Sequence, residues 1–194
     1  MMPIERLSAP DFLAANFARW GGQYAHRRAR NAAAKFFWPN YQKTRINLLL
    51  LPDLMAMTAE HCSFCDGFPI ETTGDSIEHF IPKTKAPKLA YQWENLFYCC
   101  LKCQGSKQEQ FDDKLLRPDI AGYSFVYYFQ YDTKTGKIIP NADREESVQQ
   151  RAAKTIELYG LNEYGRPRAR KRTLHMFVAG LHQLTDFPYR FILV

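Results

Sequence analysis

The sequence predicts a mixed α+β fold in which a four-cysteine zinc site holds a short β-rich core, with N-terminal helices before it and a C-terminal β-hairpin plus helices after it. Two Cys-x-x-Cys pairs follow one another along the chain, and two β-prone segments lie between them. Segments with apolar residues at helical spacing stand on both sides. We expect one compact unit of three regions: a helical region (1–58), the zinc-bound core (59–115), and a hairpin and helical region (116–194).

The composition indicates a folded protein that favours negatively charged partners. Of the 194 residues, 46% are hydrophobic and 14% aromatic, which is enough to bury a sizeable core and argues against disorder. The net charge of +6 favours nucleic acid as a partner, although solubility alone would also explain it. Charged residues interrupt the start of the chain, and no apolar run approaches the roughly 20 residues of a membrane span. We therefore expect a cytoplasmic protein with no membrane partner.

The N-terminal region carries helical patterns with clear interruptions. Ser8 is placed to cap a first helix, and Gly21-Gly22 predicts a break in the helical pattern. The segment 41–51 predicts a further helix, and Pro52 restarts a short one after it.

All five cysteines lie between positions 62 and 103, and four of them form the two pairs, Cys62 with Cys65 and Cys100 with Cys103. Tetrahedral zinc takes four thiolates, and a two-residue spacer lets both sulfurs of a pair reach one ion. An odd number of cysteines in a chain expected in the cytoplasm argues against disulfides. We therefore predict that these four residues bind a structural Zn²⁺, and that Cys99 is a small buried hydrophobic residue.

The insert between the two pairs is longer than the roughly 15 to 20 residues of a usual zinc ribbon. Its segments 76–81 and 96–99 are β-prone, and Pro82 ends the first of them. The loop 83–88 has three lysines and no acid, and the polar residues 104–110 suit a short helix. The predicted order is strand, loop, strand and helix, held at both ends by zinc.

The C-terminal region predicts a β-hairpin followed by helices. The aromatic segment 125–131 predicts a buried strand in preference to a platform for stacked bases, and residues 137–139 pair back after a turn. Residues 143–158 predict an amphipathic helix, and 173–184 predict another.

The densest positive charge lies at 165–172, with five basic residues in eight positions. Contact with nucleic acid through Arg168, Arg170 and Arg172 is the favoured interpretation. The alternative is a solvated helix face that pairs with acids of a partner protein.

The zinc-bound segment resembles a known family in the order of its residues. Its elements are a first Cys-x-x-Cys pair, Glu78-His79, Pro82-Lys83, Trp93-x-Asn95-Leu96, a second Cys-x-x-Cys pair, Gln104 and Lys107. This order resembles the HNH endonucleases, which have a ββα-metal core. Over roughly residues 40–172 the chain is also similar to the PtuB-like branch of that family, found in Septu and retron-associated anti-phage systems.

The resemblance implies a metal-dependent endonuclease that hydrolyses phosphodiester bonds. His79 would be the general base, because its unperturbed pKa lies near working pH. Asn95 would hold the segment of His79 through hydrogen bonds from its side chain to the backbone. Glu78 and the side-chain oxygen of Gln104 would bind a catalytic Mg²⁺ or Mn²⁺.

The resemblance also implies partners. Lys83 and Lys107 would offer positive charge to the backbone of a nucleic acid, either DNA or tRNA. The protein partner would be an SMC/ABC-type ATPase of the PtuA kind. Retron-linked members add a reverse transcriptase and its RNA–DNA product, msDNA.

Two features leave alternatives open. Adjacent residues of a flat strand point to opposite faces, so Glu78 and His79 share a site only if the strand bulges or the site lies across its end. The family usually has Asn or His where this chain has Gln104. A zinc-stabilised module that binds nucleic acid or the ATPase without cutting is therefore an alternative function, and a nuclease acting on RNA such as tRNA is another.

Overall fold

A computed structural model describes residues 1–70, 74–180 and 183–194 of the chain. The α-helices are α1 (Asp11–Ala14), α2 (Phe17–Arg30), α3 (Ile46–Ala56), α4 (Leu101–Lys107), α5 (Phe125–Tyr128), α6 (Glu146–Leu158) and α7 (Arg166–Val178). The strands are β1 (Asn40–Tyr41), β2 (Thr44–Arg45), β3 (Asp75–His79), β4 (Leu96–Cys100), β5 (Phe129–Tyr131) and β6 (Ile138–Pro140). Short 3₁₀ helices are η2 (Pro87–Leu89), η3 (Trp93–Asn95), η4 (Leu184–Asp186) and η5 (Arg190–Ile192).

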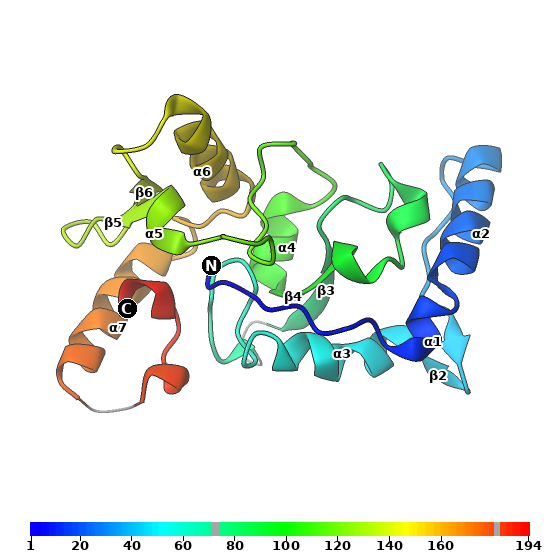
Figure 1. Cartoon of the computed structure of the whole chain (residues 1–194), viewed down its shortest axis with the longest axis horizontal. Helices are drawn as coiled ribbons and strands as arrows, with labels where there is room; N and C mark the ends of the chain where they lie inside the picture. Colours follow the sequence, from blue (N-terminus) through cyan, green and yellow to red (C-terminus); the bar gives the residue numbers. More distant parts are fainter. Residues whose placement is uncertain (71–73, 181–182) are drawn as a thin grey trace.

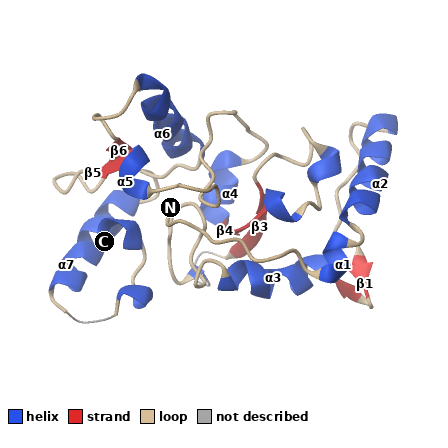
Figure 2. Cartoon of the chain, in the orientation of Figure 1, coloured by secondary structure: helices blue, strands red, loops and turns tan. Residues whose placement is uncertain are grey.

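The architecture is mixed α+β, as predicted, and within the described ranges the strands form three two-stranded antiparallel sheets. The strands are few and short beside the helices and loops (Figure 2). The β3–β4 hairpin lies near the middle of the molecule, with α2 at one end and α5, α6 and α7 at the other (Figure 1). None of the described helices is long and apolar enough to cross a membrane.

The central unit is the β3–β4 hairpin with helix α4 after it. β3 and β4 pair from Asp75 opposite Cys100 to His79 opposite Leu96. Every residue of β4 is buried, and α4 begins directly after it. The predicted order of strand, loop, strand and helix is confirmed, and the second cysteine pair spans the junction between β4 and α4.

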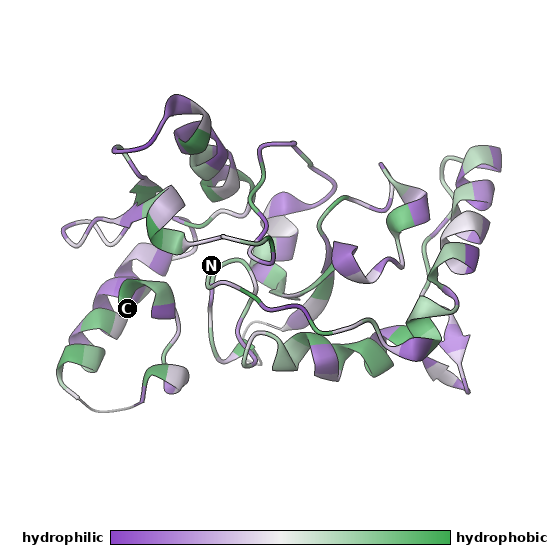
Figure 3. Ribbon diagram, viewed as in Figure 1, coloured by the Kyte–Doolittle hydropathy of each residue, from purple (hydrophilic) through white to green (hydrophobic). Residues whose placement is uncertain are grey.

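Helix α3 lies beside this hairpin and packs against β4 (Figure 1). Ile46, Leu50 and Leu54 recur every four residues along one side of α3 and are fully buried. The α3 ribbon is largely hydrophobic around its circumference (Figure 3). It therefore supplies much of the apolar surface under the hairpin.

Two predicted interruptions of the N-terminal helices are wrong. Helix α2 continues through Gly21-Gly22. Gly21 lies so close to the carbonyl oxygen of Lys88 that a Cβ would collide with it, which accounts for a glycine inside the helix. The absence of a side chain at Gly21 allows α2 and η2 to pack closely together. Helix α3 likewise continues through Pro52. Proline has no N–H to donate to the carbonyl oxygen of Leu48, four residues earlier. Because Leu48 and Pro52 are both exposed, water can donate to that oxygen instead.

The predicted strand at 125–131 is only partly correct, because its first four residues form helix α5. Phe125 and Tyr128 are buried, whereas Val126 and Tyr127 are exposed, which is the three-residue repeat of a helix. Strand β5 follows and pairs with β6, as the hairpin prediction requires.

Two helix boundaries also differ from prediction. Helix α1 begins at Asp11 with Pro10 at the cap position, and Ser8 lies outside it. Helix α7 begins at Arg166, so nearly all of the basic stretch lies inside a helix that ends at Val178. Residues 181 and 182 of the helix predicted at 173–184 lie outside the described residues.

Contacts between distant residues join the ends of the chain to the central unit. Arg190 donates through Nη2 to Asp66 Oδ1 at 2.6 Å, beside the first cysteine pair. Arg6 donates through Nε to Asp119 Oδ2 at 2.7 Å and lies over the ring of Phe97 in β4. The N-terminal and C-terminal segments are thus fastened to the same core.

Candidate active site and metal centre

Four cysteine sulfurs converge at one point. The Sγ atoms of Cys62, Cys65, Cys100 and Cys103 all lie within 4.8 Å of one another, and all four residues are buried. The Cys65 and Cys100 sulfurs are 3.8 Å apart. Zinc–sulfur bonds of ~2.3 Å in a tetrahedron would separate two sulfurs by about 3.8 Å. The cluster could therefore hold a metal ion such as zinc, while Cys99 lies outside it, fully buried as predicted.

Arg166, at the start of α7, contacts this cluster, and the sequence did not indicate it. Its Nη2 lies 3.1 Å from Cys103 Sγ and 3.8 Å from Cys100 Sγ. Its Nη1 donates to the carbonyl oxygen of Tyr159 at 3.0 Å. Burial opposes the charge of this guanidinium, but the neighbouring sulfurs, Cys103 first, raise the pKa of Arg166 above its usual value. A buried cation thus faces the four sulfurs.

A depression of about 480 Å³ opens at the end of β3. Its lining residues are Glu78, His79, Pro82, Lys83, Leu101, Gln104, Gly105, Gln108 and Glu109. Glu78 and His79 both reach it, because β3 ends at His79 and the depression lies across that end. The structure thus brings together Glu78, His79, Lys83 and Gln104 from the predicted site.

The ring of His79 is fixed by contacts on several sides. Nε2 lies 2.9 Å from the carbonyl oxygen of Ala90, which can only accept, so Nε2 carries the proton and Nδ1 keeps its lone pair in the neutral ring. The ring stacks on Trp38 at 5.5 Å between centroids and meets the ring of Phe36 at 5.2 Å. Burial, followed by the charge of Lys83, lowers the pKa of His79 to about 3. The ring is therefore neutral at physiological pH.

Asn95 fixes the backbone just after His79. Its Oδ1 accepts from the Ile81 backbone N–H at 2.8 Å, and its Nδ2 donates to the Ile81 carbonyl oxygen at 3.0 Å. Nδ2 also donates to the carbonyl oxygen of Leu89 at 3.2 Å. One amide thus holds both ends of the loop 81–89, which carries Lys83.

Lys107 is fully buried against Glu78. Its Nζ lies 2.6 Å from Glu78 Oε1 and donates to the carbonyl oxygen of His79 at 3.0 Å. Burial raises the pKa of Glu78 to about 7, against the opposing attraction of the Lys107 ammonium. The prediction that Lys107 contacts a nucleic-acid backbone is corrected, because this ammonium lies inside the protein with a carboxylate partner.

Gln104 presents its amide oxygen as an acceptor near Glu78. Its Nε2 donates to the Ile77 carbonyl oxygen at 3.3 Å, which leaves Oε1 as the acceptor end of the amide. A carboxylate and an amide oxygen are hard donors of the type that Mg²⁺ and Mn²⁺ take, so this donor set fits a divalent ion. The sequence did not indicate Glu109, which accepts from Thr84 Oγ1 at 2.5 Å and from Lys83 Nζ at 3.3 Å.

Three arginines of α7 were predicted to contact nucleic acid, and they do not all lie on the surface. Arg168 and Arg172 are exposed, but Arg170 is fully buried and donates to Gly136 and Leu161 carbonyl oxygens. The prediction for Arg170 is therefore corrected, because the helical repeat of four residues turns it inward with Arg166.

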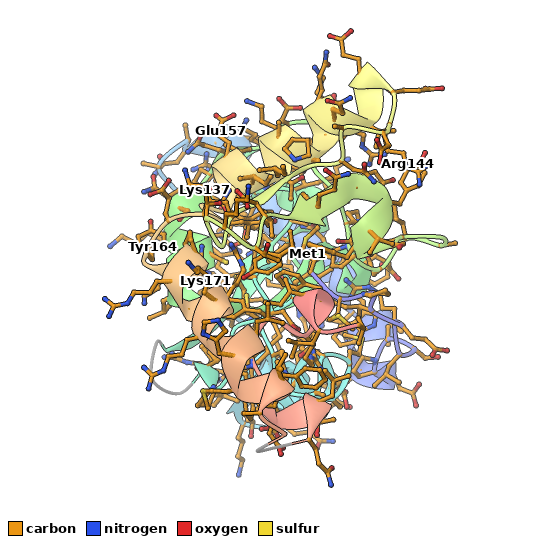
Figure 4. The ribbon with its side chains drawn as sticks, turned by 90° about the vertical axis from the view of Figure 1, so that its left-hand side faces the viewer. Met1, Lys137, Arg144, Glu157, Tyr164 and Lys171 are labelled. Atoms are coloured by element: carbon orange, nitrogen blue, oxygen red, sulfur yellow. The ribbon has the colours of Figure 1, made fainter. Side chains whose placement is uncertain are left out.

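The outward face of α7 meets the β5–β6 hairpin. The Nζ of Lys171 donates to the carbonyl oxygen of Lys134 at 3.1 Å, and Tyr164 and Lys171 line one shallow depression there. Lys137, Tyr164 and Lys171 lie on the same side of the molecule (Figure 4).

Comparison with known proteins gives a partial similarity to a Septu protein. No protein-family profile matches the chain. A segment of 55 residues is 34% identical to a Septu protein PtuB of Bacillus thuringiensis. That segment is 28% of this chain and spans only 21% of the PtuB protein. The similarity indicates a relationship to a Septu protein over a short part of both chains.

Proposed function

We propose that this chain is a metal-dependent endonuclease of the HNH type that hydrolyses phosphodiester bonds in nucleic acid. The observation that carries the proposal is the depression at the end of β3, where Glu78, His79, Lys83 and Gln104 meet. The order of β3, β4 and α4 supports a ββα core, and the four-cysteine cluster supports a structural zinc beneath it.

In this proposal, His79 accepts a proton from the attacking water through Nδ1. The bond from Nε2 to Ala90 keeps the tautomer that this role needs. The low pKa makes the free ring a weak base, but a bound phosphate beside it would raise its affinity for a proton. Asn95 holds the following backbone in place, and Lys83 attracts the phosphate.

Glu78 and Gln104 would hold the divalent ion. When bound, such an ion would supply positive charge to the phosphate and to the departing oxygen. Arg168 and Arg172 are exposed on α7 and offer further positive charge to a nucleic acid.

The proposed setting is anti-phage defence beside an SMC/ABC-type ATPase of the PtuA kind. The partial similarity to a Septu PtuB protein supports this setting. A retron reverse transcriptase and its msDNA are proposed as further partners on the resemblance of the motif alone.

A second candidate function is a zinc-stabilised module that binds nucleic acid or the ATPase without cutting. Two observations favour it. The Glu78 carboxylate already has the Lys107 ammonium at 2.6 Å, and Gln104 stands where the resembled family has Asn or His.

Cleavage assays with the complete zinc-loaded chain, alone and with the ATPase, test this proposal. Linear duplex DNA, single-stranded DNA and tRNA are incubated with Mg²⁺ or Mn²⁺ and run on gels. We expect cleavage that falls about 100-fold or more in His79→Ala, the range for loss of a general base. His26→Ala is the matched control, because this exposed histidine of α2 lies outside the depression.

Equal cleavage by wild type and His79→Ala would contradict the proposed role of His79 as general base. Binding without cleavage in every condition would favour the second candidate. Cleavage of tRNA but not of DNA would keep the chemistry and assign the substrate to RNA.

A further inference from the structure

A second depression, which we call the aromatic depression, is formed by residues 36–40 at the start of the β1–β2 hairpin together with Arg45 of β2, and three of its six lining residues are aromatic. It has a volume of about 560 Å³. Its lining residues are Phe36, Phe37, Trp38, Pro39, Asn40 and Arg45. The lining contains no acid, and Phe37 is 55% exposed although its ring is large and apolar. The exposed ring of Phe37 is therefore available to a ligand that enters the depression.

The same aromatic segment forms the back of the proposed active site. Trp38 lies nearly parallel to the His79 ring, with 19° between the planes. The Nζ of Lys83 lies 5.5 Å from the centroid of Phe36. Because His79 and Lys83 line the depression at the end of β3, residues that line the aromatic depression are in direct contact with residues that line the proposed active site.

The aromatic depression is held in shape before any ligand binds. The Tyr91 hydroxyl donates to the carbonyl oxygen of Phe37 at 2.7 Å. The guanidinium of Arg27 lies 4.4 Å from the centroid of Phe37 on one side. Arg45 is exposed at the edge of the depression. Aromatic faces beside arginines suit a ligand that combines a flat ring with a negative charge.

We propose that this depression binds an unpaired nucleobase of the strand whose phosphate lies at His79. The inference rests on the proposed function, since it takes the depression at the end of β3 as the phosphate site. Each base carries a face that can stack on Phe37, and Arg45 can neutralise the neighbouring phosphate. A base inside a duplex cannot enter, so the depression favours single strands, loops or locally opened sites.

Binding measurements with the complete zinc-loaded chain test the inference without any cleavage. The probes are a fluorescent oligothymidylate of about 12 nucleotides and a strand of the same length whose central sugars carry no bases. No divalent ion is added. We expect the base-free strand to bind about tenfold more weakly, since stacking of one base is worth ~1–3 kcal/mol.

Phe37→Ala should remove most of this preference, with a loss of about fivefold for oligothymidylate and no change for the base-free strand. Phe37→Trp should restore the preference, because it restores a stacking face. Tyr127→Ala removes an exposed ring of α5, far along the chain from the depression, and should leave both affinities unchanged.

The inference fails if wild type binds both strands equally, or if Phe37→Ala weakens both to the same degree. It also fails if the chain forms a dimer that Phe37→Ala dissociates, because the depression would then bind a second copy. The proposed function is judged separately. Cleavage by a protein that binds both strands equally would support the nuclease function and contradict the base-binding depression. A preference for the strand with bases, without any cleavage, would support the base-binding depression and contradict the nuclease function.

Discussion

At the scale of single residues, Lys107 is the side chain on which the proposed site most depends. It is fully buried, and its ammonium bridges the Glu78 carboxylate and the main chain of His79. A buried ion pair costs desolvation to form, but removal of one partner leaves the other charge without compensation. Lys107 therefore orients Glu78 toward the depression and holds the end of β3 to α4.

Lys107→Met should lower the free energy of unfolding by about 3–5 kcal/mol, measured by urea denaturation of the zinc-loaded protein. The loss follows from an unpaired buried carboxylate, so Glu78→Gln in the same chain should restore part of it. The control is Lys154→Met, which breaks the exposed pair with Glu157 on α6 and should leave the free energy of unfolding nearly unchanged. Similar losses for Lys107→Met and Lys154→Met would show that burial of the first pair has no energetic consequence.

At the scale of elements, the cluster of four cysteines is a junction between the β3–β4 hairpin and α7. Arg166 directs its guanidinium at the Cys103 sulfur from the first turn of α7. Four thiolates around a bound Zn²⁺ ion would carry a net negative charge, which this buried cation would offset. Groups that contact metal ligands from outside commonly change metal affinity by ~10–100-fold.

Arg166→Met should therefore release zinc at least about tenfold faster to a chromogenic chelator than wild type does. Arg168→Met is the matched control, since Arg168 lies on the same helix but is exposed. If both variants released zinc at the same rate, the contact of Arg166 with the sulfurs would have no role in metal retention.

The sequence predicted the elements whose causes are local. The spacing of Cys62, Cys65, Cys100 and Cys103 indicated one metal cluster, and the β-prone segments between them indicated the hairpin. The predictions that are wrong concern features that depend on contacts between segments far apart in the chain. Gly21 permits contact with η2 and does not break α2, a difference that depends on a neighbour far along the chain.

In the candidate site too, the sequence indicated some residues and missed those that distant segments contribute. The resemblance of the motif put Glu78, His79 and Gln104 forward, and they share one depression. Arg166 and Trp38, which contact the sulfurs and the His79 ring, come from distant segments and carry no local signal. The prediction that Arg170 contacts nucleic acid is wrong because the side of α7 on which Arg170 lies depends on the residue at which the helix begins.

At the scale of the whole molecule, the N-terminal segment is fastened to the core by Arg6. It donates to Asp119 and to the carbonyl oxygens of Trp93 and Leu96, which flank the start of β4. Burial alone would raise the pKa of Asp119, but hydrogen bonds from Arg117 and Arg6 hold it below its usual value of 3.8. The paired carboxylate therefore stabilises the fold above that pH and loses its contribution as the pH falls below it.

Asp119→Asn should lower the free energy of unfolding by about 3 kcal/mol at pH 7, because Arg6 loses its charged partner. The difference between wild type and variant should narrow as the pH falls through 3.8, where the wild-type carboxylate begins to take up a proton. Urea denaturation of both proteins across this range measures the difference, and loss of zinc in acid affects both alike. A difference that stays constant with pH would contradict this account.

The contact of Arg166 with the cysteine cluster also has a consequence for synthesis. A ribosome joins Cys62 through Lys107 to the growing chain well before it adds Arg166, and Arg190 follows later still. During that interval the sulfurs lack the contact with Arg166, and Asp66 lacks its ion pair with Arg190. If the cluster holds zinc, a chain whose translation is interrupted in this interval would bind the ion without the Arg166 contact, and would therefore bind it less firmly than the finished chain.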